Sequence, residues 1–61
     1  MNVKLLTLGA MARRLGVETK WLRGEAEAGL LPHVKAGKTL LFNPRAVERI
    51  LVERASRGGQ R

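Results

Sequence analysis

The segment LGAMARRLGVETKWLRGEAEAG, residues 8–29, decides the expected fold of this chain. In its first half, apolar residues recur at i, i+3, i+4 and i+7 and line one face of an α-helix: Leu8, Met11, Ala12 and Leu15. Thr7 stands before this face as a candidate N-cap, and Gly16 follows it where a left-handed C-terminal cap is expected. We therefore expect a helix over residues 8–15.

The second half of the segment predicts another helix, which begins at Glu18 or Thr19 and runs to Ala28, before Gly29. Only two or three residues, one of them a glycine, separate the two helices, and this spacing is typical of a helix-turn-helix. Trp21 is expected to flank the core, because a domain with only two aromatic residues can scarcely expose one of them.

A β-hairpin is expected after the second helix. Pro32 excludes continuation of that helix and favours an extended backbone before it. Two short β-prone runs, residues 33–35 and 39–42, then flank a turn that contains a glycine. Within the second run, Leu40 and Phe42 share a face by the period of two, so both are expected to point at the core.

Asn43 and Pro44 predict the start of a third helix, because asparagine is a good N-cap and proline suits the first helical position. Its apolar face is formed by Val47, Ile50, Leu51 and Ala55. The expected fold class is mainly α with a small β-hairpin, in the element order α-α-β-β-α. One domain is expected over residues 1–55, followed by a flexible basic tail over residues 56–61.

The charge of the chain favours a polyanionic partner. Twelve Lys and Arg residues oppose five Asp and Glu residues, which leaves a formal net charge of +7 on 61 residues. So strong a positive field on so small a surface is typical of nucleic-acid binding. The second helix is the exception, because residues 18–29 carry two cations and three carboxylates.

Several classes of function are not expected. The chain has no cysteine and one histidine, His33, so neither a metal site nor a Ser-His-Asp constellation can be assembled, and no cofactor is expected. All five carboxylates are expected on exposed helical faces. No apolar run approaches the roughly 20 residues that span a bilayer. We therefore expect a cytoplasmic, nucleoid-associated protein that is not an enzyme.

The order of these elements resembles one family, the excisionase-type DNA-binding domain, a small winged helix-turn-helix related to the MerR superfamily. The resemblance covers about residues 5–52 and is carried by Leu5-Leu6-Thr7, Ala12-x-x-Leu15-Gly16-Val17, Gly29-x-Leu31-Pro32, Val34-Lys35-x-Gly37, Leu40-x-Phe42 and Val47. It implies binding of double-stranded DNA, with the second helix in the major groove and the hairpin over a neighbouring phosphate track. It also implies a role as a recombination directionality factor beside a phage-type tyrosine or serine integrase, or as a small transcriptional regulator.

Two sets of residues are the candidate DNA contacts. Residues near the start of the second helix are expected to reach base edges: Thr19, Lys20 and Arg23. Residues of the first helix and the hairpin are expected to contact phosphates: Arg13, Arg14, Lys35, Lys38 and Thr39. Glu18 and Glu27 are expected to repel phosphate or face solvent, although a glutamate can also accept a hydrogen bond from cytosine N4.

Three alternatives stay open on the sequence alone. One is a stand-alone transcriptional regulator, and another is a protein-interaction adaptor that uses the mixed charges of the second helix. The third, an RNA-binding ribosomal accessory protein, is disfavoured because few aromatic residues are present to stack on bases. Because residues 18–29 carry net negative charge, one copy is expected to bind DNA weakly and to rely on cooperative self-association or on the integrase.

Overall fold

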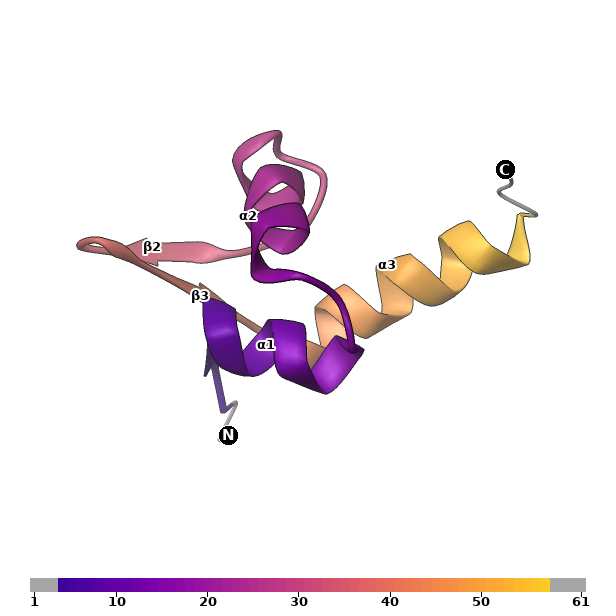
Figure 1. Cartoon of the computed structure of the whole chain (residues 1–61). Coiled ribbons are helices and arrows are strands. Elements are labelled where there is room, and N and C mark those ends of the chain that lie inside the picture. Colours follow the sequence, from indigo (N-terminus) through magenta and orange to yellow (C-terminus); the bar gives the residue numbers. More distant parts are fainter. Residues whose placement is uncertain (1–3, 58–61) are drawn as a thin grey trace.

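The computed structural model describes residues 4–57, which form three helices and a three-stranded antiparallel sheet. In chain order the elements are β1 (Leu6–Thr7), α1 (Leu8–Leu15), α2 (Thr19–Glu27), β2 (Val34–Ala36), β3 (Thr39–Phe42) and α3 (Pro44–Ser56). Figure 1 shows the β2–β3 hairpin projecting from one side of the molecule and α3 extending from the other, with α1 and α2 between them. The three expected helices and the expected hairpin are all present.

Local capping explains where α1 begins and ends. The Thr7 hydroxyl accepts a hydrogen bond from the Ala10 N–H at 3.3 Å, which satisfies one of the free donors of the first turn. At the other end Gly16 has φ 75°, a left-handed conformation that costs glycine little, and its N–H donates to the Ala12 carbonyl. The predicted bounds of α1, including both caps, are confirmed.

The sheet is larger than the sequence predicted. The expected two-stranded hairpin is joined by β1, which pairs antiparallel with β3 in the register Leu6 opposite Phe42 and Thr7 opposite Leu41. The strand order is β1-β3-β2. A strand of two residues is too short to show a period-two pattern, so only its pairing with Leu41 and Phe42, far along the chain, reveals it.

The core lies between the helices and one face of the sheet. Its largest fully buried side chains are Phe42, Met11, Leu22, Leu31 and Val47. Leu40 and Phe42 are both buried, as the alternation of β3 predicted. The prediction that Trp21 flanks the core is wrong, because Trp21 is 40% exposed. At 100° per residue it points away from the inward face of α2, which Leu22 and Ala26 occupy.

Two ion pairs join α3 to the other helices. The Arg14 Nε atom of α1 lies 2.6 Å from Oε2 of Glu48, and the Arg54 Nη1 atom lies 2.8 Å from Oε1 of Glu25 on α2. The expectation that every carboxylate lies on an exposed face is wrong for Glu25, whose side chain is only 19% exposed. The Arg54 guanidinium explains this burial, because a partly buried carboxylate needs a partner to offset its lost hydration.

The third helix is 13 residues long and ends one residue later than predicted, with Arg57 as its C-cap. Of the expected tail, residues 58–61 lie outside the described residues. Among residues 4–57, no helix has the length and apolar character needed to cross a membrane.

Replacement of Asn43 by alanine should lower the free energy of unfolding by about 1 kcal/mol. The Asn43 Oδ1 atom accepts from the N–H groups of Arg45 at 3.1 Å and Ala46 at 3.5 Å, and alanine leaves both donors without this partner. Urea denaturation followed by circular dichroism measures the change. Asn43→Asp, which keeps the acceptor, is the matched control and should retain most of the stability. Equal losses in the two variants would contradict a capping role.

Candidate nucleic-acid interface

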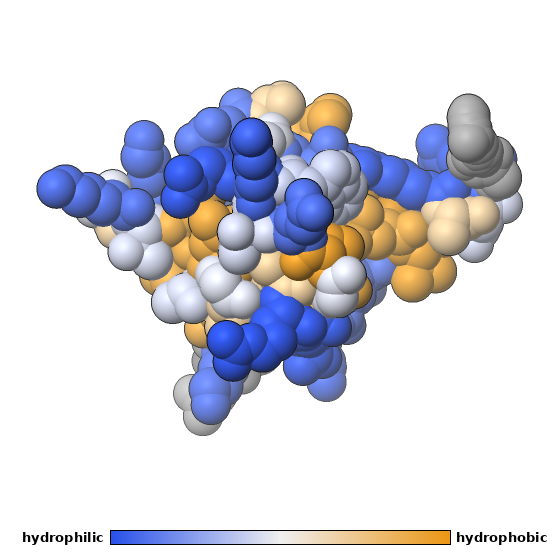
Figure 2. All heavy atoms as spheres, viewed as in Figure 1, coloured by the Kyte–Doolittle hydropathy of each residue, from blue (hydrophilic) through white to orange (hydrophobic). Residues whose placement is uncertain are grey.

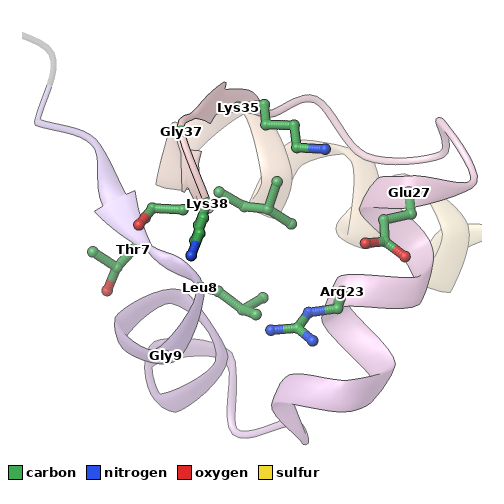
Figure 3. A pocket seen from close by; sticks show the side chains of 10 residues that line it. Thr7, Leu8, Gly9, Arg23, Glu27, Lys35, Gly37 and Lys38 are labelled. Atoms are coloured by element: carbon green, nitrogen blue, oxygen red, sulfur yellow. The ribbon is translucent and has the colours of Figure 1, made fainter.

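An open groove of about 660 Å³ lies between α2, the hairpin and the start of α1. Figure 3 shows side chains from all three elements arranged around it. The groove is lined by Thr7, Leu8, Gly9, Arg23, Glu27, Lys35, Gly37, Lys38, Thr39 and Leu40. Four of the eight predicted contact residues are therefore brought together: Arg23, Lys35, Lys38 and Thr39.

Strand register explains why the hairpin lysines reach this groove. Lys35 is paired directly with Leu40, and directly opposed residues of antiparallel strands lie on the same face of the sheet. Leu40 is buried on the core side, so Lys35 also leaves the sheet toward the helices. Lys38 lies in the turn of the hairpin beside Gly37, whose φ of 64° forms the tight connection that glycine favours.

The cations of the groove have no carboxylate partner within residues 4–57, where the two ion pairs are Arg14–Glu48 and Arg54–Glu25. Three cationic side chains and one carboxylate, that of Glu27, line the groove, so its net charge is positive. The positive end of the α1 dipole adds to this field, because the first turn of α1 forms part of the wall. An anion can therefore bind here without displacing an internal salt bridge.

The sequence did not indicate that Leu8 and Gly9 line the groove. The N-cap at Thr7 marked the positive end of a helix, but nothing local could show that this end borders the hairpin. Glu27 was expected to repel phosphate or face solvent, with acceptance from cytosine N4 as the alternative, and it lies inside the groove beside the cations.

The other four predicted residues lie outside the groove. By the helical period, Thr19 and Lys20 share the face of α2 that carries Arg23, one turn nearer its N-terminus. Arg13 is exposed in the last turn of α1. Arg14 follows it but is bound to Glu48, so its charge is already partly neutralised within the molecule. α1 thus contributes Leu8 and Gly9 to the groove and neither of its arginines.

The molecular surface around these elements is predominantly polar. In Figure 2 hydrophilic side chains project from the hairpin and from the region of α1 and α2, while apolar atoms show between them and along α3. Within residues 4–57 no group of three or more His, Cys, Asp or Glu side chains is placed to hold a metal ion.

No protein-family model, no curated protein and no solved structure matches this chain.

Proposed function

We propose that this protein binds double-stranded DNA as a winged helix-turn-helix, with α2 in the major groove and the β2–β3 hairpin as a wing on the adjacent phosphate backbone. The observation that carries the proposal is the open groove in which Arg23 of α2 faces Lys35 and Lys38 of the hairpin. An exposed helix beside a cationic hairpin offers one element for base edges and another for phosphates.

The dimensions of α2 support this assignment. An α-helix with its side chains is about 10–12 Å across. The major groove of B-DNA is about 12 Å wide and admits one α-helix. Thr19, Lys20 and Arg23 share one exposed face of α2 and are the proposed base contacts. A-form RNA is a poorer partner, because its major groove is too narrow and deep for side chains to read.

The resemblance to excisionase-type domains extends the proposal to an accessory role in recombination beside an integrase, and a transcriptional regulator would use the same groove. The longest dimension of the protein is 34 Å, about one turn of B-DNA. One copy can therefore cover only a short site, and adjacent copies would gain affinity through effective concentration.

Fluorescence-anisotropy titrations with duplex DNA, single-stranded DNA and duplex RNA of one sequence test the proposal. We expect the tightest binding to duplex DNA. Equal affinity for all three polymers would mean that the groove binds polyanions without selectivity. Absence of binding at low salt would favour a protein-interaction adaptor.

Two variants separate base readout from phosphate contact. Arg23→Ala should weaken binding to a preferred duplex, selected from a random library, by about 1–3 kcal/mol and relax the preference at one base position. Lys38→Ala should weaken preferred and random duplexes nearly equally, because phosphates carry no sequence information. Both residues line the groove and neither belongs to the buried core, so each variant should fold. Identical binding profiles for the two variants would exclude α2 as the reading helix.

A further inference from the structure

We propose that Glu27 determines base specificity by accepting a hydrogen bond from the N4 amine of a cytosine close to the base that Arg23 contacts. This inference rests on the proposed binding of duplex DNA and assigns a role to the one carboxylate of the groove. It concerns which sequence is chosen, whereas the proposed function concerns which polymer is bound.

The placement of Glu27 is the first observation. Glu27 follows Arg23 by four residues on α2, so the two side chains lie on the same face of the helix, one turn apart. Figure 3 shows both side chains directed into the groove, opposite the hairpin lysines.

The second observation is that this carboxylate has no internal partner. Within residues 4–57 the ion pairs occupy Glu25 and Glu48, and Glu27 is exposed without one. The spacing between Arg23 and Glu27 suits an i,i+4 ion pair, yet the structure contains no such pair. Both charged groups therefore remain available to a ligand in the groove.

The chemistry of the major groove decides what Glu27 can accept. An ionised carboxylate only accepts hydrogen bonds, and the donors in the major groove are the N4 amine of cytosine and the N6 amine of adenine. Adenine also presents the N7 lone pair beside its amine, which repels a carboxylate, whereas cytosine presents no acceptor there. Cytosine is therefore the base that Glu27 prefers.

The spacing along α2 separates the two contacts. Four residues rise about 6 Å along a helix, and base pairs stack about 3.4 Å apart. With α2 lying along the groove, Arg23 and Glu27 reach different base pairs, about two steps apart. Arg23 contacts the O6 and N7 acceptors of guanine and Glu27 contacts cytosine N4, so together they select a short G·C-containing motif.

Glu27→Gln is the informative substitution. It keeps the shape of the side chain. Glu27 is exposed in the last turn of α2, where a negative charge interacts unfavourably with the negative end of the helix dipole. Loss of this charge should therefore not destabilise the fold. Glu53→Gln is the matched control, since it removes the same charge from an exposed residue of α3 that does not line the groove and has no ion pair among the described residues. Selection from a random duplex library, followed by titration, compares both with the unmodified protein.

The unmodified protein should prefer cytosine at one position on the order of tenfold. Glu27→Gln should bind random duplexes several-fold more tightly, because a charge that repels phosphate is lost. Its preference should move from cytosine toward adenine, because glutamine pairs with the N6 donor and the N7 acceptor of adenine together. Glu53→Gln should keep the cytosine preference. Replacing the selected cytosine by N4-methylcytosine should weaken the unmodified protein and leave Glu27→Gln nearly unaffected.

Three outcomes would overturn this role. If Glu27→Gln gains affinity but keeps the cytosine preference, Glu27 only adjusts the charge of the groove. If the unmodified protein binds duplex DNA with no base preference, the inference fails and the proposed function stands. If it binds no duplex DNA, both fail together.

Discussion

The affinity of this protein for duplex DNA is expected to fall roughly 60- to 4,000-fold when the salt concentration rises from about 50 to 200 mM. Each phosphate that a cation neutralises releases condensed counterions, and the logarithm of affinity then falls by about 0.9 per contact for each decade of salt. The cations Arg23, Lys35 and Lys38 line the groove without internal ion pairs among the described residues. Lys20 of α2 and Arg13 of α1 are exposed outside the groove and can add phosphate contacts. We therefore expect a slope of about −3 to −6.

Anisotropy titrations at a series of salt concentrations measure this slope. The double variant Lys35→Ala, Lys38→Ala should reduce its magnitude by about two, one unit for each phosphate contact that is lost. A slope near zero for the unmodified protein would remove the electrostatic basis of the proposal. An unchanged slope in the double variant would instead mean that the hairpin does not contact the backbone.

Replacement of Phe42 by alanine is expected to cost about 3–5 kcal/mol of folding free energy, through lost burial and the cavity left behind. Phe42 is the largest fully buried side chain, and it lies where β3 pairs with Leu6 of β1. The ring of His33 packs near it at a centroid distance of 6.2 Å. A chain of this length has a total stability of roughly 3–9 kcal/mol, so one substitution removes a large share of it.

Circular dichroism during thermal and urea unfolding measures the loss. The matched control is Val52→Ala, a change at an apolar residue that is 62% exposed, which should shift stability by no more than about 0.5 kcal/mol. Similar small losses in both variants would contradict the assignment of Phe42 to the centre of the core. A loss confined to Phe42→Ala would agree with it.

The sequence alone determined the three helices and the hairpin, because their signals are local. The caps at Thr7, Gly16 and Asn43 act on backbone groups within one turn of themselves, and periodic apolar residues define each buried face. The net charge of +7 is also a property of the sequence alone, and it favours a polyanionic partner whatever the fold.

The tertiary structure alone decided which residues from distant segments meet. The pairing of β1 with β3 and the Arg54–Glu25 ion pair depend on how the elements pack, and no local pattern encodes them. The same holds for the groove, where Arg23 and Glu27 of α2 face lysines of the hairpin. The groove residues come from elements that are far apart in the sequence. Burial of the apolar faces orients these elements, so the residues meet only once the core has formed.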